Sequence, residues 1–119
     1  FKADVGQDIL ATLLDSDDGA RRLGEAALIP YNSPISQSNM LFYETLFDEN
    51  ASCHLALGKA YPTCLAGGTN LSDEEAAAAG LNDSMVHVDF MIGSADMIIE
   101  GLCEDGTVVP VFINGNWAN

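Results

Sequence analysis

Residues 84–93 (SMVHVDFMIG) form the segment that most constrains the fold, because they predict a β-strand with polar groups on one face. Apolar residues there alternate with the polar His87 and Asp89, and a period of two places successive side chains on opposite faces of a sheet. Side chains two apart on a strand share a face, with about 7 Å between their roots. His87 and Asp89 can therefore converge on one cation.

A single histidine in an apolar strand is also compatible with a structural role. Such a residue is commonly hydrogen-bonded in the core, and a neighbouring carboxylate can fix its tautomer. The only other histidine, His54, follows the acidic pair Asp48 and Glu49, and the isolated Glu25 interrupts an apolar run at residues 23–29. Metal binding and a structural role therefore both stay open at this point.

The charge balance limits the classes of partner. The chain has 18 acidic side chains against 4 lysines and arginines, a formal net charge of −14. Such a chain repels nucleic acid and anionic membrane surfaces, so neither is expected as a partner, and cations are its natural counter-charge. No stretch approaches the roughly 20 apolar residues that a membrane span needs.

The cysteines and the first residue indicate the context of the chain. Cys53, Cys64 and Cys103 are odd in number and contain no C-x-x-C pair, which argues against a disulfide framework or a structural zinc site. Reduced thiols of a cytosolic protein are the expectation. The sequence begins at Phe1 rather than Met, and we expect it to be a piece of a longer polypeptide.

The first half of the chain predicts a mixture of elements. Residues 4–18 have the apolar spacing of an amphipathic helix with Asp4 as its N-cap. Residues 21–29 predict a buried strand that ends before a proline. Residues 31–39 have the composition of an exposed loop, and residues 40–47 (MLFYETLF) predict a buried segment of undetermined type.

The second half is mainly β-structure. Within residues 51–61 the alternation predicts a strand that ends at Gly58, and Ser72 with Glu75 forms a capping box for a short alanine-rich helix. Residues 97–113 predict a β-hairpin through an Asp-Gly turn, and residues 114–119 a terminal turn. The expectation for residues 1–119 is one domain of the α+β class, mainly antiparallel β-structure with two short helices.

Five candidate ligands share one chemistry. They are oxygen and nitrogen groups, without a thiolate, which suits hard or borderline divalent ions. Five ligands exceed the number that one catalytic zinc uses, so two ions are the economical interpretation. The candidates are Glu25, Glu49, His54, His87 and Asp89.

Three motifs in order resemble the thermophilic-type metalloaminopeptidases, the aminopeptidase S and T family of leucyl aminopeptidase type. They are LGEAALIP at residues 23–30, LFDENASCHLALGKAY at residues 46–61 and VHVDFMIG at residues 86–93. The resemblance extends over nearly the whole chain, to the NGNW sequence at residues 114–117.

The resemblance implies a cytoplasmic exopeptidase that removes N-terminal residues from peptides. It implies a dinuclear site in which zinc, cobalt or magnesium ions activate a water, and assembly as a homodimer. It implies further that the chain is the metal-binding C-terminal domain of a two-domain enzyme. The family also uses a glutamate upstream of the first motif, so we expect this chain to be inactive without the preceding part.

The resemblance also suggests a role for each site residue. Glu25 would bridge both metal ions, and Glu49 with His54, His87 and Asp89 would supply the other ligands. Tyr61 would be the catalytic tyrosine that donates a hydrogen bond to the developing oxyanion. Glu25 or Glu49 could carry the proton to the leaving amine, and the sequence does not separate ligand from base.

Two other classes of function are compatible with the residues. Cys53 or Cys64 could act as a nucleophile with His87 as base and Asp89 to orient it, which would make a cysteine-dependent hydrolase. The chain could instead be a non-catalytic acidic module for metal binding or dimerisation.

Overall fold

The computed structural model describes residues 2–119, which form two compact units. The first unit contains the residues up to Ala26 together with Leu55–Phe90, and the second contains Ala27–His54 together with Met91–Asn119. Short helices accompany two antiparallel three-stranded sheets, so the predicted α+β class is confirmed. None of the helices within residues 2–119 has the length and apolar character needed to cross a bilayer.

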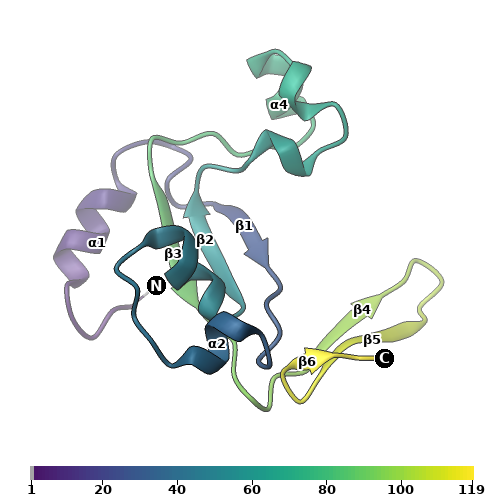
Figure 1. Ribbon diagram of the computed structural model, residues 1–119. Coiled ribbons are helices and arrows are strands. Elements are labelled where there is room, and N and C mark those ends of the chain that lie inside the picture. The colour runs from purple at the N-terminus through teal and green to yellow at the C-terminus, as the bar shows by residue number, and fades with distance from the viewer. Residues whose placement is uncertain (1) are drawn as a thin grey trace. The chain divides into compact units, whose positions relative to one another are not determined.

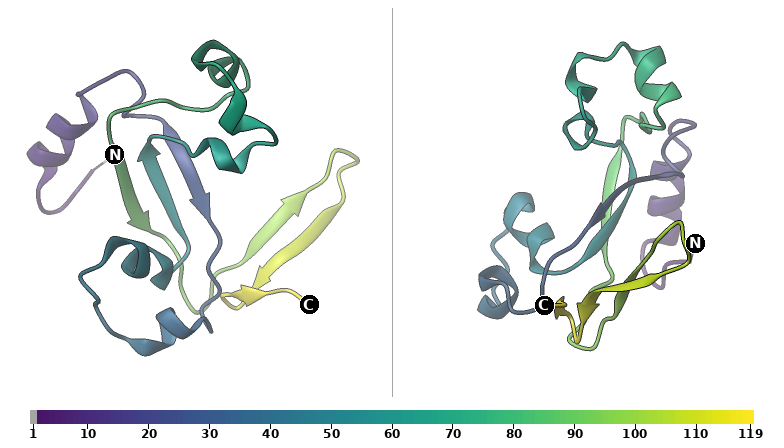
Figure 2. Two further views of the ribbon diagram at one scale, coloured as in Figure 1. Left: turned by 45° about the horizontal axis from the view of Figure 1, so that its top comes forward. Right: turned by 90° about the vertical axis from the view of Figure 1, so that its right-hand side faces the viewer.

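A three-stranded sheet organises the first unit (Figures 1 and 2). Its strands are β1 (Leu23–Ala27), β2 (His54–Gly58) and β3 (His87–Met91), in the order β1-β2-β3. The arrows alternate in direction from β1 to β3, which makes the sheet antiparallel (Figure 2). The predicted strands are therefore present, each shorter than its apolar segment.

Strand β1 differs from its prediction as a buried strand. It is an edge strand, and the side chain of its first residue, Leu23, is exposed. The buried strand is instead the central one, β2, in which Ala56 is fully buried. An edge strand and a central strand can have equally apolar sequences, because their burial depends on what pairs with them.

The first helix, α1 (Gln7–Leu14), is shorter than the predicted range of residues 4–18 and begins differently. Its N-cap is Gly6, in a left-handed conformation with φ of 72°, so the prediction of Asp4 as N-cap is wrong. The Ala3 amide donates to the Gln7 side chain over 2.6 Å, which places Asp4 in the turn before the helix. Leu14 is buried where the helix ends.

Asp17 ties the turn after α1 to the segment that leads into β3. Its carboxylate accepts hydrogen bonds from the amides of Gly19, Ala20 and Met85, each over 2.9 Å, and from the Ser84 hydroxyl over 3.0 Å. The Met85 amide is the main reason that the pKa of Asp17 lies below its ordinary value of 3.8, because these donors favour the ionised carboxylate.

We expect Asp17→Asn to lower the melting temperature at pH 7, because an amide cannot accept all four hydrogen bonds. A group whose pKa is depressed on folding stabilises the fold above its unfolded pKa, and that contribution is lost as the pH falls through the folded pKa. The difference from wild type should therefore narrow below pH 3.8. Thermal unfolding followed by circular dichroism at a series of pH values measures it, with Asp18→Asn as the exposed control. A gap that stays constant down to pH 2 would contradict this role.

The predicted capping box begins helix α4 (Asp73–Ala78) of the first unit. The Ser72 hydroxyl accepts from the Glu75 amide over 3.3 Å, and the Glu75 carboxylate accepts from the Ser72 amide over 2.8 Å. Two 3₁₀ turns, Pro62–Cys64 and Gly68–Asn70, lead from β2 toward this helix. The prediction of a short capped helix is confirmed, because its signal is local in sequence.

The second unit contains a helix where the sequence predicted a loop. Helix α2 (Pro34–Ser38) is capped by Ser33, whose hydroxyl accepts from the Ser36 amide over 3.2 Å. A serine before a proline is a favourable helix start, because the proline lacks the amide hydrogen that the first turn leaves unused. The prediction of a loop over residues 31–39 is therefore wrong in its centre.

The predicted burial of residues 40–47 is also wrong. The segment runs into helix α3 (Thr45–Asp48), and the 3₁₀ turn Glu49–Ala51 follows that helix. Tyr43 is 88% exposed and has a positive φ of 57°. The carboxylate of Asp48 accepts from the amides of Phe42 and Glu44 over 2.8 and 3.1 Å, which closes the segment into a surface loop. The apolar side chains of this loop are exposed in the structure of residues 2–119.

The predicted β-hairpin is present as β4 (Ile99–Leu102) and β5 (Val108–Ile113), antiparallel through a turn that contains Gly106 with φ of 83°. A third strand, β6 (Asn116–Trp117), extends it where a terminal turn was predicted (Figure 1). The Phe112 and Trp117 rings meet edge to face, with centroids 4.6 Å apart and planes at 75°. Phe112 is fully buried and anchors this sheet.

Candidate metal centre

His87, the first residue of β3, is held through one ring nitrogen and offers the other. Its Nδ1 lies 2.8 Å from the Lys59 carbonyl oxygen, which can only accept, so Nδ1 is the donor. In the neutral ring Nε2 then carries a lone pair. From the sequence, a neighbouring carboxylate was the group expected to fix the tautomer of His87. In the structure the main-chain carbonyl of Lys59 has that role.

The main chain after β2 places this carbonyl. Gly58 has a φ of 98°, and a Cβ at this position would clash with the Val86 carbonyl oxygen. The Lys59 amide donates to the same Val86 oxygen over 2.8 Å. Gly58 and Lys59 were not among the predicted site residues. The sequence contained one signal for them, a glycine that ends a strand just before a predicted site residue.

Two carboxylates face the free nitrogen of His87. Its Nε2 lies 3.4 Å from Glu25 Oε2 and 3.3 Å from Asp89 Oδ1. All three side chains are largely shielded from solvent, between 18% and 25% exposed. Asp89 Oδ1 is buried and has no hydrogen-bond partner among residues 2–119. One imidazole nitrogen and two carboxylate oxygens thus lie close to one another.

Such a cluster requires a positive charge, either a proton on Nε2 or a metal ion. A buried carboxylate oxygen without a donor is costly, and a cation offsets that cost. One imidazole nitrogen and two carboxylate oxygens are ordinary ligands of zinc and similar divalent ions, and a ligating histidine commonly donates its other nitrogen to a carbonyl. The donor set therefore fits the predicted class of metal ion.

The strand order brings these residues together although Glu25 is far from the other two in sequence. Strands β1 and β3 lie on either side of β2, so their backbones are about 9.6 Å apart. The long side chains of Glu25 and His87 span that separation, while Asp89 shares a strand with His87. The sequence singled out all three residues but contained no measure of this distance.

Tyr61 lies beside the cluster. Its ring centroid is 5.3 Å from that of His87, with the planes tilted by 51°, and its side chain is 51% exposed. The predicted catalytic tyrosine is therefore adjacent to a predicted ligand and accessible to a small molecule.

The other two predicted ligands belong to the second unit. His54 is buried, with Nδ1 3.0 Å from the Ser52 carbonyl oxygen, and Glu49 begins the 3₁₀ turn after α3. His87 Nε2 lies near one oxygen of Glu25 and one oxygen of Asp89, each as a separate pair. Within residues 2–119 no group of three or more His, Cys, Asp or Glu side chains has the geometry to hold a metal ion as it stands. The five-residue ligand set stays a prediction.

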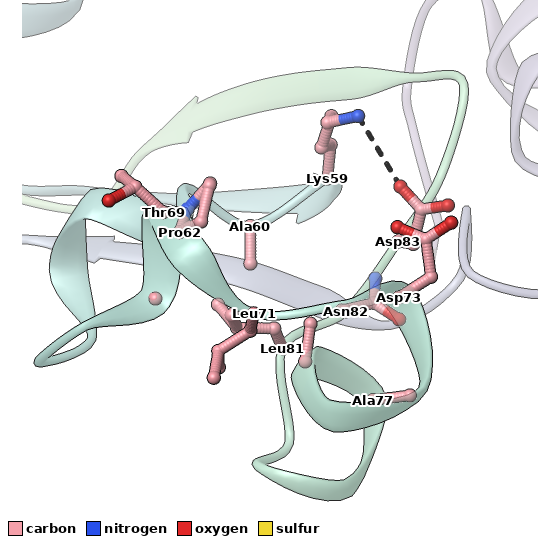
Figure 3. Close-up of a pocket in the computed structure, with 12 residues that line it drawn as sticks. Lys59, Ala60, Pro62, Thr69, Leu71, Asp73, Ala77, Leu81, Asn82 and Asp83 are labelled. Carbon is pink, nitrogen blue, oxygen red and sulfur yellow. Dashed lines mark hydrogen bonds and ion pairs between the residues drawn. The ribbon is translucent and has the colours of Figure 1, made fainter.

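A neighbouring cavity of about 220 Å³ contains none of the predicted site residues (Figure 3). Lys59 and Asp83 form an exposed ion pair across its rim, with 3.3 Å between Nζ and Oδ1. Ala60, Leu71 and Leu81 line its apolar part. The side chain of Lys59 therefore points to this cavity, while its carbonyl serves His87.

Comparison with known proteins now decides the family. A model of the thermophilic metalloprotease (M29) family matches residues 1–117. The chain belongs to this family. The resemblance stated from the three sequence motifs is thereby confirmed.

Named bacterial relatives support the M29 assignment. The chain is 63% identical over 118 residues to aminopeptidase 2 of Geobacillus stearothermophilus and 60% identical over 118 residues to aminopeptidase AmpS of Bacillus subtilis. These alignments cover 99% of this M29 chain and 29% of each relative. The chain therefore spans less than a third of the length of these relatives.

A solved structure shows the same fold. Wild-type AmpT from Thermus thermophilus superposes with a TM-score of 0.87 at 48% sequence identity, over 99% of this M29 chain and 28% of AmpT. The α+β arrangement described above is therefore shared with a part of that larger protein.

Proposed function

We propose that this chain supplies the metal-binding part of a metal-dependent aminopeptidase that acts on peptides. The observation that carries the proposal is the meeting of Glu25, His87 and Asp89 at His87 Nε2, with Nδ1 fixed by the Lys59 carbonyl. The metalloprotease family and the aminopeptidase names of the relatives support it.

The proposed cofactor is a pair of divalent ions of zinc, cobalt or magnesium. Glu25, His87 and Asp89 would hold them together with Glu49 and His54, with Glu25 as a shared ligand of the pair. When bound, such ions polarise a carbonyl and lower the pKa of a water, so that it is a nucleophile at neutral pH.

The reaction adds one water across the first peptide bond and releases the N-terminal amino acid and a peptide that is one residue shorter. The Lys59 carbonyl keeps the proton on His87 Nδ1, so Nε2 stays available as a ligand. Tyr61 donates a hydrogen bond to the oxygen of the scissile carbonyl as negative charge develops there. Glu25 or Glu49 carries the proton to the leaving amine.

The wider setting is part of the same proposal. Residues 1–119 would be a C-terminal metal-binding domain of a cytoplasmic homodimer. The net charge of −14 supports a peptide substrate rather than nucleic acid or an anionic membrane. The cysteine-dependent alternative is not favoured at Cys53, whose buried thiol is 3.2 Å from both the amide and the carbonyl of Ile29, since a reactive thiol needs access to substrate.

Removal of the metal tests this function. We expect exhaustive chelation of the full-length polypeptide to lower its aminopeptidase activity by more than about 100-fold, because losing even an outer partner of a metal ligand typically costs 10–100-fold. Zinc, cobalt or magnesium should restore the activity, measured as release of the N-terminal residue from a synthetic peptide.

Two outcomes would contradict the proposal in different ways. Activity that survives chelation would exclude the metal mechanism, and would favour the cysteine-dependent alternative if a thiol alkylator then abolishes it. Metal binding measured by calorimetry, without hydrolysis of any peptide by the metal-loaded full-length polypeptide, would indicate a non-catalytic metal-binding module.

A further inference from the structure

A cavity of about 330 Å³ lies in the first unit beside the edge strand β1. Two residues of the candidate metal centre, Glu25 and Tyr61, are part of its wall. Because Tyr61 also contacts the ring of His87, the cavity borders the proposed site of reaction. The rest of its wall is mostly apolar and includes Leu23, Ala26, Leu65, Ala79 and Leu81.

The chemistry of this wall indicates what the cavity can accept. No lysine or arginine lines it, and Glu25 is its one carboxylate, beside the weakly acidic Tyr61 and Cys64. Asn82 is also part of the wall, but its amide nitrogen already donates to the Gly19 and Gly58 carbonyl oxygens over 2.9 and 2.6 Å. An anionic guest would lose hydration without gaining a cationic partner, whereas an apolar guest would bury surface against leucine and alanine side chains.

The size of the cavity indicates a single residue. Its volume is at the lower end of the 300–1,000 Å³ that small-molecule sites commonly have. One side of the cavity is formed by β1. The other side includes Leu65 and Ala79, the C-cap of α4, which belong to the segment that follows β2. The neighbouring cavity of Figure 3 shares Ala60 and Leu81 with this one, which therefore form a common wall.

We propose that this cavity receives the side chain of the substrate's N-terminal residue, and that Leu65, Ala79 and Leu81 are specificity-determining residues. The inference rests on the proposed aminopeptidase function and adds which residues select the substrate. An exopeptidase must hold the first residue next to the groups that act on its carbonyl, and the wall of this cavity contains both Glu25 and Tyr61. The small side chain of Ala79 leaves room for a large apolar residue.

The test fills the cavity from one position. In the full-length polypeptide with added divalent metal, Ala79→Phe should lower kcat/KM for peptides that begin with leucine by at least about 10-fold relative to peptides that begin with alanine. Pocket contacts worth one methylene group already discriminate by about 10-fold or more. Ala78→Phe is the matched control, because Ala78 is an exposed neighbour on the same helix that does not line the cavity.

A second variant keeps the test decisive if Ala79→Phe does not fold, and inhibition by a product adds a binding measurement if it does. Leu65→Ala widens the cavity and should raise the preference for phenylalanine over leucine at the N-terminus. Free leucine, a product, should inhibit Ala79→Phe more weakly than it inhibits wild type and Ala78→Phe. The preference for one N-terminal residue over another is a ratio within one protein, so a general loss of stability does not imitate its change.

The outcomes separate the two proposals. A wild-type polypeptide that hydrolyses no N-terminal residue in the presence of metal would overturn the aminopeptidase function and the inference with it. Suppose instead that the wild type is active. If the ratio of kcat/KM for leucine-initiated to alanine-initiated peptides then changes equally in Ala79→Phe and Ala78→Phe, or in neither, only the role of the cavity is overturned. Leu65→Ala with unchanged preference would do the same.

Discussion

His87→Gln in the full-length polypeptide should lower kcat/KM for a leucine-initiated peptide by at least about 1,000-fold, or about 4 kcal/mol of transition-state stabilisation. His87 is the one side chain that both carboxylates of the cluster face, and the Lys59 carbonyl holds its other nitrogen. In glutamine an amide oxygen replaces the imidazole nitrogen, and such an oxygen is a much weaker ligand for zinc or cobalt than imidazole. Steady-state kinetics with saturating metal measure the loss.

Metal content measured by elemental analysis gives a readout that is independent of activity, and His87→Gln should retain less zinc or cobalt than wild type. Lys59→Ala is the matched control, because it keeps the carbonyl that positions His87 and removes only an exposed ion pair with Asp83. Such pairs contribute little to stability, about 0–1 kcal/mol. Equal losses in the two variants, or a fully active His87→Gln, would remove His87 from the proposed centre.

Phe112→Ala should lower the free energy of opening the β4-β5-β6 sheet by about 3–5 kcal/mol, the usual cost of replacing a buried phenylalanine with alanine. Phe112 is 0% exposed, and its ring meets that of Trp117 edge to face. Such an aromatic pair adds about 0.5–1.5 kcal/mol to the effect of burial. Hydrogen exchange at the amides of β5 in the full-length polypeptide measures this local stability.

Ile113→Ala is the control for this second prediction, because Ile113 is adjacent on β5 and 49% exposed. Its effect should stay below about 1.5 kcal/mol, since little apolar surface is lost from the core. Similar exchange rates in both variants would mean that Phe112 is not the anchor of this sheet.

Local signals in the sequence determined several elements correctly. The Asp-Gly turn predicted the β4–β5 hairpin, and the Ser72 and Glu75 pair predicted the start of α4. Both signals are complete within a few residues, so nothing distant can cancel them. The same holds for the three motifs that indicated the family, because a match in order along the chain requires no knowledge of the fold.

Burial was less predictable than the elements themselves. Residues 40–47 have the composition of a core segment, yet Tyr43 is exposed because the hydrogen bonds from Phe42 and Glu44 to Asp48 direct the chain outward. Composition states how favourable burial would be, whereas the neighbours that provide it come from other parts of the chain. The helix at Pro34–Ser38 was not predicted, because its polar composition is typical of a loop. Ser33 before Pro34 is nevertheless a good helix N-cap.

The sequence by itself determined the kinds of groups at the candidate centre, through an acid within an apolar run and a histidine and an aspartate two residues apart. Only the tertiary structure decided that Glu25 meets His87 across β2, that the Lys59 main chain rather than a carboxylate fixes the imidazole, and that a mostly apolar cavity adjoins Tyr61. The reason is that residue type and spacing along one strand are local properties. Distances between strands follow from the order in which the strands pair.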